Sequence, residues 1–276
     1  MSLFVATCPI LSGFAQGQTY ADLAVTNELK LQMTVGAPHI MKLLSNGCFY
    51  SIAQRDANDT PILSLSSYTD VSTVFFWESG RTALRAGLFS GARLNPWNMG
   101  VASAAFGYDT EARSLALAGG SMSKAYGDGY LAYGQTNIAS GPWSIALGDT
   151  SAALGGVSFA VGIVATATGA GSVALGAWTL AGGDFSLAGG IQTHADSYGS
   201  VTFGRHNVGS YTGTNGNHQW NAEDPLFELG NGADATAATN WSPIPSNALT
   251  VYKNGNATFQ GVVRVAPGGD IPMFVP

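Results

Sequence analysis

The chain has 276 residues with 46% hydrophobic and 11% aromatic content, which is enough to build a core and excludes a disordered linker despite 37 glycines. Charged residues make up only 10%, the net charge is −6 and the pI is near 5.0, so nucleic acid is excluded as an expected partner because it requires a basic surface. No apolar run reaches the length of about 18 residues that a membrane-spanning helix needs.

The first 17 residues are apolar, and no charge precedes Asp22. Ala15 and Gly17 offer small residues where a signal peptidase would cut, although a basic start is missing. We expect residues 1–17 to be a secretion signal, with a buried N-terminal strand as the alternative, and the protein to be secreted or at the cell surface. The two cysteines, Cys8 and Cys48, are too few for a disulfide framework or a zinc site.

Residues 18–98 are expected to form an irregular β region. Alternating apolar and polar residues over 29–35 predict a half-buried strand. Asn46-Gly47, between "MKLLS" and "CFYSIA", predicts a tight hairpin turn. We expect the run Phe75-Phe76-Trp77 to belong to the core or to contacts between chains.

Residues 99–213 carry a repeat with a step of 14. A first phrase of alternating small and bulky residues recurs as Tyr130-Leu-Ala-Tyr-Gly134, Ser144-Ile-Ala-Leu-Gly148, Ser158-Phe-Ala-Val-Gly162, Ser172-Val-Ala-Leu-Gly176, Ser186-Leu-Ala-Gly-Gly190 and Ser200-Val-Thr-Phe-Gly204. A second phrase, Ala-x-Gly, keeps the same step at Ala125, Ala139, Ala153, Ala167 and Ala181, and weakens at Ala195. Ser103–Gly107 and Ser114–Ala118 look like earlier copies that are out of register.

Alternation with a period of two is typical of strands, and two short strands with two tight turns fit within one step of the repeat. One such coil cannot bury its own bulky side chains, so coils must stack at the strand spacing of roughly 4.8 Å. Glycine ends each first strand because the turn needs a positive φ or a close backbone approach. The sequence therefore predicts an all-β solenoid.

The two faces of the first strand differ in size. We expect the bulky face to line the inside of the coil, in ladders formed by Ile145, Leu147, Phe159, Val161, Val173 and Leu175. The face of serine, alanine and glycine is then either exposed to solvent or packed against neighbouring chains. The residues alone leave these two alternatives open.

The 14-residue step resembles the head repeat of trimeric autotransporter adhesins, the YadA-like left-handed parallel β-roll. The likeness covers about residues 99–213. It implies a parallel homotrimer, and no membrane-anchoring barrel strands or stalk heptads accompany it. The flanks, "VFFWESGRTALRAGLFSGARLNPWNMG" and "DPLFELGNG…NALTVYKNGNATFQG", resemble bacterial extracellular and phage fibre proteins.

Residues 214–276 are expected to form a C-terminal β cap. Lys253-Asn254-Gly255-Asn256 joins "ALTVY" to "ATFQGVVRV" and predicts a hairpin. The preceding segment 209–225 is polar, glycine-rich and aromatic. We expect it to connect the repeats to the cap, and a binding loop is the alternative.

The repeat region contains little chemistry. Between residues 130 and 213 the charged residues are Asp149, Asp184, Asp196 and Arg205, and Asp184 and Asp196 are out of register for a catalytic pair. His194, His206 and His218 are 12 apart, which does not match the 14-residue step, so we expect no metal site within one chain. We expect no catalytic residue, no cofactor and no enzyme activity.

The expected function is a non-catalytic trimeric extracellular fibre or adhesin-like protein for surface attachment or assembly, with further copies of itself as partners and a cell-surface glycan or a protein as the expected ligand. The alternative is a phage tail-fibre tip that recognises a host glycan. An ice binder is disfavoured because the seventh coil positions form no threonine ladder: they are Thr136, Thr150, Val164, Trp178, Gln192 and His206. Trp143, Trp178 and His206, which interrupt the small-residue pattern, are the predicted contact residues, although Trp143 is as well explained by packing between chains.

Overall fold

The computed structural model describes residues 28–33, 39–44, 49–54, 72–90, 99–209, 217–234 and 243–261. For residues 28–33, 39–44, 49–54, 72 and 73 it describes the backbone only. The described residues form strands and turns, and no helix among them could cross a membrane. The chain divides into two compact units, unit 1 over residues 1–143 and unit 2 over residues 144–276. Cys8, Cys48, the segment 1–17 and the Asn46-Gly47 turn lie outside the described residues.

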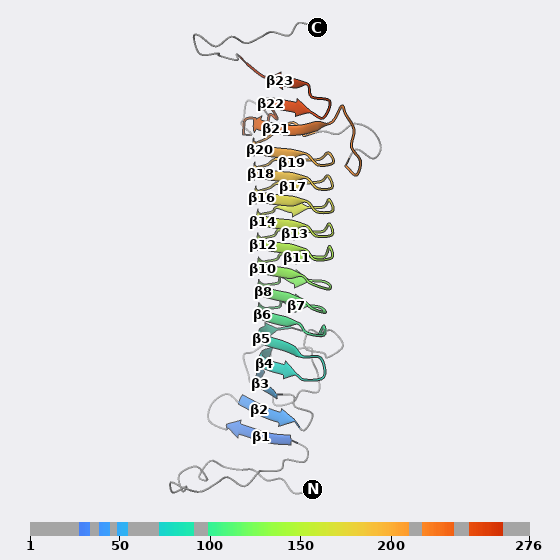
Figure 1. The fold of residues 1–276 in the computed structure, drawn as a ribbon. Helices are drawn as coiled ribbons and strands as arrows, with labels where there is room; N and C mark the ends of the chain where they lie inside the picture. The colour runs from blue at the N-terminus through green and yellow to red at the C-terminus, as the bar shows by residue number, and fades with distance from the viewer. Residues whose placement is uncertain are drawn as a thin grey trace, which may run out of the picture. The chain divides into compact units, whose positions relative to one another are not determined.

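Unit 1 begins with antiparallel strands and continues with parallel ones (Figure 1). Its larger sheet has the order β1-β2-β3-β4-β5-β6-β8-β10, and its smaller sheet contains β7, β9 and β11. The pairs from β1 to β5 are antiparallel, and β5, β6, β8 and β10 are parallel. The strands are β1 (Glu28–Met33), β2 (His39–Leu44), β3 (Phe49–Gln54), β4 (Ser72–Glu78), β5 (Ala83–Phe89), β6 (Ala104–Tyr108), β7 (Glu111–Ala112), β8 (Leu117–Ser121), β9 (Lys124–Ala125), β10 (Leu131–Gln135) and β11 (Ile138–Ala139).

Unit 2 has the reverse order of strand directions, parallel first and antiparallel last. Strands β12, β14, β16, β18, β20 and β21 are parallel, β22 and β23 follow antiparallel, and β13, β15, β17 and β19 form a second parallel sheet. The strands are β12 (Ile145–Asp149), β13 (Ala152–Ala153), β14 (Phe159–Ile163), β15 (Thr166–Ala167), β16 (Val173–Ala177), β17 (Leu180–Ala181), β18 (Leu187–Ile191), β19 (His194–Ala195), β20 (Val201–Arg205), β21 (Pro225–Asn231), β22 (Asn247–Tyr252) and β23 (Ala257–Phe259).

The parallel β-solenoid with 14-residue coils is confirmed. Ile145 pairs with Phe159, and Phe159 pairs with Val173, so each residue meets its counterpart in the next copy of the repeat. The expected hairpin of β22 and β23 is also confirmed, with the Tyr252 carbonyl accepting from the Gly255 amide at 3.0 Å. The parallel ladder also includes β5 and β21, which lie outside residues 99–213.

One earlier copy of the repeat has a different alignment from the expected one. The register pairs Gly120 with both Gly107 and Gly134, so the true copy is Ala116–Gly120 and the alignment of Ser114–Ala118 is wrong. The step from Gly107 to Gly120 is shorter by a single position than the step from Gly120 to Gly134. A strict 14-residue count back from Tyr130 reaches Ala116, so this copy is in register, and the missing position displaces Ser103–Gly107.

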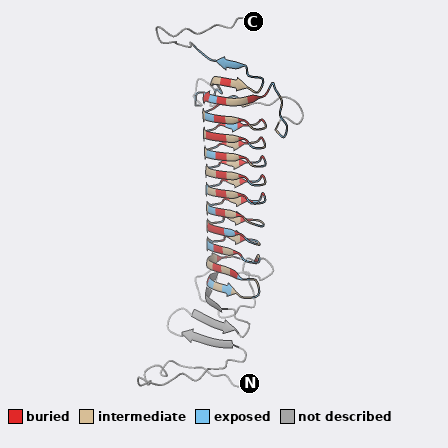
Figure 2. Cartoon of the chain, viewed as in Figure 1, coloured by how far each residue is buried: buried red, intermediate tan, exposed pale blue. Residues whose placement is uncertain are grey.

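The assignment of faces is wrong as well. In Figure 2 the buried residues recur at the same strand positions of successive coils, and they are the small ones. Ala146, Ala160, Ala174 and Ala188 are fully buried, as are Ala153, Ala167, Ala181 and Ala195 on the second strand. The six bulky residues expected inside point outward instead, half-buried or exposed: Ile145, Leu147, Phe159, Val161, Val173 and Leu175.

The width of the coil explains this reversal. Only Thr150 and Ser151 separate β12 from β13, so the two strands of one coil lie close together. The space between them accommodates methyl and hydroxymethyl groups and cannot hold two layers of larger side chains. The interior also holds Ser144, Ser158, Ser172 and Ser186, which are almost completely buried.

Candidate interaction surfaces

The outward side chains of the first sheet in unit 2 form an apolar surface, which we call the outer apolar face. The most exposed side chains of this face are between 36% and 49% exposed: Ile163, Leu175, Ile191 and Phe203. The coil strands β12, β14, β16, β18 and β20 carry charge at two positions: Asp149 ends β12, and Arg205 ends β20. The full set is Ile145, Leu147, Phe159, Val161, Ile163, Val173, Leu175, Leu187, Ile191, Val201 and Phe203.

The second sheet of unit 2 faces outward with a mixed surface. Its strands β13, β15, β17 and β19 present Ala152, Thr166, Leu180 and His194. An extended apolar surface on one side of a molecule, but not on the other, marks the first side as a candidate contact surface. Unit 1 has comparable exposed residues on its larger sheet, namely Phe75, Trp77, Phe106, Tyr108, Leu117 and Tyr133.

Exposed aromatic rings cover glycines of the preceding coil. A side-chain carbon built on Gly119 would lie 2.3 Å from the Tyr133 ring, and one on Gly189 would lie 2.6 Å from the Phe203 ring. Trp143 covers Gly129 in the same way. In each pair the aromatic residue follows the glycine by one coil. These rings therefore pack within their own chain while keeping much of their surface open.

The predicted contact residues have different environments. Trp143 and Trp178 are 63% and 51% exposed and remain candidates for a contact role. The prediction for His206 is wrong, because this side chain is only 5% exposed and its Nε2 lies 2.9 Å from Asp234 Oδ1. Arg205 also reaches Asp234, at 3.0 Å, and these contacts lower the pKa of the Asp234 carboxyl, with the His206 hydrogen bond as the main cause. His206 therefore holds the chain after β20 and is not open to a partner.

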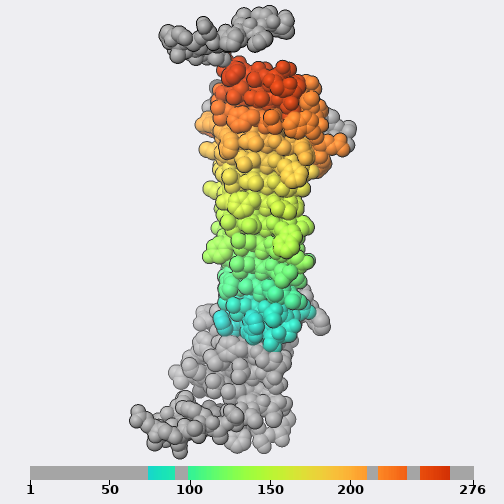
Figure 3. Space-filling model, in the orientation of Figure 1, coloured from blue at the N-terminus to red at the C-terminus, as the bar shows by residue number. Residues whose placement is uncertain are grey.

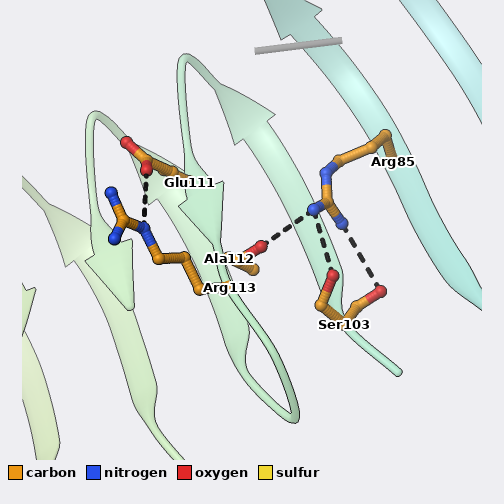
Figure 4. A network of polar contacts seen from close by, with 5 residues as sticks. All are labelled: Arg85, Ser103, Glu111, Ala112 and Arg113. Atoms are coloured by element: carbon orange, nitrogen blue, oxygen red, sulfur yellow. Dashed lines mark hydrogen bonds and ion pairs between the residues drawn. The ribbon is translucent and has the colours of Figure 1, made fainter. Parts of the chain in front are cut away.

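Arg85 fills the interior of the first coil in unit 1 (Figure 4). It pairs in register with Ala105, and it occupies the buried column that alanine occupies in the next coils. Its guanidinium donates to the Ser103 hydroxyl at 3.0 Å, to the Ala112 carbonyl at 2.9 Å and to the Leu84 carbonyl at 2.8 Å. Burial lowers the pKa of Arg85 to about 10, against the opposing effect of Glu111, so the side chain stays charged at neutral pH.

Glu228, in unit 2, occupies the buried column that alanine occupies in the preceding coils of that unit. It pairs with Thr202 in the register of β20 and β21 and is 3% exposed. Oε2 accepts from Asn207 Nδ2 at 2.8 Å, and Oε1 accepts from Asn247 Nδ2 at 2.6 Å. Burial raises the pKa of Glu228, the two asparagines lower it, and the nearby Asp196 carboxylate raises it further.

The remaining titratable groups of the repeats are dispersed. Asp184 Oδ2 lies 2.9 Å from His218 Nδ1, while Asp196 lies near His194 and has its pKa raised mainly by burial. The three predicted histidines thus meet different partners. Among the described residues no group of three or more His, Cys, Asp or Glu side chains could hold a metal ion. Sequence reasoning missed that the Asp196 charge acts on Glu228, whose carboxylate is enclosed and has both oxygens engaged.

The segment 217–224, part of the expected connection, is fixed at both ends. The Asn217 carbonyl accepts from the Asp184 amide at 2.7 Å, next to the His218–Asp184 contact. At its other end, the Lys253 amide donates to the Asp224 carbonyl at 3.0 Å, and the Asn254 amide donates to the Ala222 carbonyl at 2.9 Å. Trp220 lies between these attachments and is 57% exposed.

No protein-family model matches the chain, and no curated protein matches it significantly.

Proposed function

We propose that the chain is a non-catalytic, homotrimeric extracellular fibre or adhesin-like protein that serves attachment to a surface or assembly. The observation that carries the proposal is the outer apolar face of unit 2. Full burial of a Leu, Ile or Phe side chain contributes roughly 1.5–3 kcal/mol, so a ladder of half-covered side chains favours association without any ion pair. Further copies of the same chain are the natural occupants, because a surface that repeats at every coil matches another surface with the same repeat.

Three further features support an attachment role. The coils repeat the same surface groups at a fixed spacing, and a trimer would present each of them three times. The buried charged groups Arg85 and Glu228 are engaged in structural contacts. The resemblance of the repeat to adhesin heads, noted from the sequence, points to a trimer in particular. A phage tail-fibre tip is the alternative, with the same fold, and detecting residues 1–17 in the mature protein would favour it.

Sedimentation velocity at micromolar concentration tests the assembly. We expect the wild type to sediment as a trimer and Leu175→Asp, in the middle of the outer apolar face, to shift it toward monomer. Leu154→Asp is the matched control: Leu154 is 44% exposed but lies just after β13, away from that face. A folded wild-type monomer, or equal effects of the two substitutions, would overturn the proposal.

A further inference from the structure

The indole ring of Trp220 contacts a buried charged group and is also exposed to solvent. The ammonium of Lys253 lies over the ring, 5.2 Å from its centroid. Lys253 Nζ also lies 3.7 Å from Asp224 Oδ2, and both side chains are closed to solvent. Trp220 itself is 57% exposed, although the ammonium and the carboxylate of this ion pair are buried. A buried ion pair thus supports an exposed aromatic surface.

This arrangement fixes the ring before any ligand arrives. The backbone bonds to Asp184 on one side and to Lys253 and Asn254 on the other hold the segment that carries Trp220. A ring that is already ordered loses little conformational entropy on binding. Trp178, by comparison, is exposed to a similar degree but has no cation over its ring among the described residues.

The segment of Trp220 and the hairpin of Lys253 carry exposed hydrogen-bonding groups. Gln219, Glu223 and Asn254 are exposed. Asn254 Nδ2, on the hairpin that carries Lys253, lies 3.3 Å from both carboxylate oxygens of Glu223 in the segment 217–224, so an amide and a carboxylate lie side by side. Each of these groups keeps unused donors or acceptors, so the pair can bind two neighbouring hydroxyls.

We propose that Trp220, with Gln219, Glu223 and Asn254, forms a binding site for a neutral saccharide. The C–H face of a pyranose ring would stack on the open side of the indole, and its hydroxyls would bond the flanking amides and carboxylate. A cationic ligand is disfavoured because Lys253 already occupies the cation position on this ring. An anionic ligand is disfavoured by Glu223. The ligand that remains is uncharged, apolar on one face and rich in hydroxyls.

The site is open, so a single copy should bind weakly. No deep hollow is visible on the face of unit 2 that Figure 3 displays, and enclosing pockets are what give small ligands high affinity. The inference deepens the attachment function proposed above and rests on it, because weak sites serve attachment only when several copies engage together.

Saturation-transfer NMR with maltotriose, lactose and chitotriose as separate probes tests the site. We expect at least one probe to receive saturation from the wild type. Trp220→Ala should weaken that binding by about tenfold or more, while the control Phe259→Ala, at an aromatic side chain that is 58% exposed, should leave it unchanged within about twofold. Trp220→Tyr, which keeps a ring, should retain part of the binding and serves if the alanine variant does not fold.

The oligomeric state of each variant, measured by sedimentation, separates the two proposals. A wild-type trimer that binds none of the three probes overturns the saccharide site alone. A monomer that binds a probe through Trp220 overturns the trimeric fibre alone. If Trp220→Ala dissociates the trimer and leaves probe binding unchanged, Trp220 belongs to an interface between copies, and the saccharide site is overturned.

Discussion

At the scale of the residue, the turns of the solenoid accept backbone strain at regular positions. Thr150, Val164 and Trp178 all have φ between 53° and 56°, a left-handed conformation that costs a non-glycine residue about 1 kcal/mol or more. The strain is offset by backbone hydrogen bonds between coils. The Val164 amide donates to the Asp149 backbone carbonyl, and the Trp178 amide donates to the Ile163 backbone carbonyl, both at 2.8 Å. Sequence reasoning placed positive φ at glycine and missed these turn residues, because valine and tryptophan rarely adopt it.

The glycine that ends each first strand is required by a close backbone approach. Gly162 has φ 145°, and a side-chain carbon there would lie 1.8 Å from the Gly176 carbonyl oxygen of the next coil. We expect Gly162→Ala to destabilise the protein by more than about 4 kcal/mol, because neither backbone can move away without breaking the ladder. Thermal or urea unfolding measures the loss.

Gly199 provides the matched control. Its φ is 64°, but nothing lies within 4 Å of the added carbon. Gly199→Ala should therefore cost only the conformational strain of about 1 kcal/mol. Similar losses for the two variants would show that φ, and not the contact with the next coil, explains the glycine column.

At the scale of the element, alternation identifies which residues share a face of a strand but not which face is inside. The pattern around Ala160 correctly separated the small residues from Phe159 and Val161. The assumption that bulky residues fill the core failed because the coil is too narrow. The buried alanines show that the two faces are reversed, so the apolar side chains form an outer surface.

The positions of Arg85 and Glu228 in the coil interior could have been predicted by extending the repeat. Ala83-Leu-Arg-Ala-Gly87 matches Ser103–Gly107, and Phe227-Glu-Leu-Gly230 matches Val201–Gly204, which places Arg85 and Glu228 in the alanine column. Both steps are longer than the regular one, so a search limited to the regular step misses them. A charged residue in that column indicates that the regular stack ends there.

Arg85 should stabilise the first coil through its hydrogen bonds. Arg85→Met keeps most of the side-chain volume but leaves the carbonyls of Leu84, Ser103 and Ala112 without this donor. Buried acceptors that lose a donor cost about 1–3 kcal/mol each, partly relieved by rearrangement, so we expect a loss of about 2–4 kcal/mol in urea unfolding.

Arg113→Met is the control for this measurement. Arg113 contacts Glu111 at 3.3 Å, but its side chain is 60% exposed (Figure 4). An exposed ion pair contributes less than about 1 kcal/mol, so the control should unfold almost like the wild type. Equal losses for both arginines would contradict a special role for the buried one.

Glu228 should make stability depend on pH in the direction opposite to ordinary acid denaturation. Its pKa is raised in the folded state, mainly by burial. As the pH falls from 7, the folded protein takes up this proton before the unfolded chain does, so the burial penalty of the charge is relieved and stability rises until the unfolded carboxyl also protonates, near its usual pKa. Asp196 shifts in the same direction.

Unfolding free energies at several pH values for the wild type and Glu228→Gln isolate this contribution. The stability of the wild type relative to the variant should increase as the pH falls from 7 toward 5. The exposed Glu223→Gln serves as the control and should show no such trend. A relative stability that falls with the pH would mean that the hydrogen bonds from Asn207 and Asn247 outweigh burial.

At the scale of the whole molecule, the repeat predicts the parallel coils because each coil supplies only half of its own contacts. The strands that end the parallel pairing are harder to predict. Strand β4 pairs antiparallel with β5, and β22 pairs antiparallel with β21, so in each unit a strand of reversed direction follows the last parallel one. Reversed strands do not continue a parallel register, so among the described residues β4 and β22 each end the parallel pairing of the larger sheet in their own unit.

The outer apolar face predicts how assembly responds to concentration and salt. If copies of the chain cover this face, the folded state is linked to association, and each tenfold dilution favours separation by about 1.4 kcal/mol per chain released. The melting temperature should therefore fall clearly over a hundredfold dilution, roughly in proportion to the logarithm of concentration.

Since Asp149 and Arg205 lie only at the two ends of the face, moderate salt should change the melting temperature little. Calorimetry at low and high concentration, with and without added sodium chloride, measures both effects. A melting temperature independent of concentration would mean that the apolar side chains stay exposed on a monomer, and a steep loss of stability in salt would mean that charged groups, and not this face, hold the copies together.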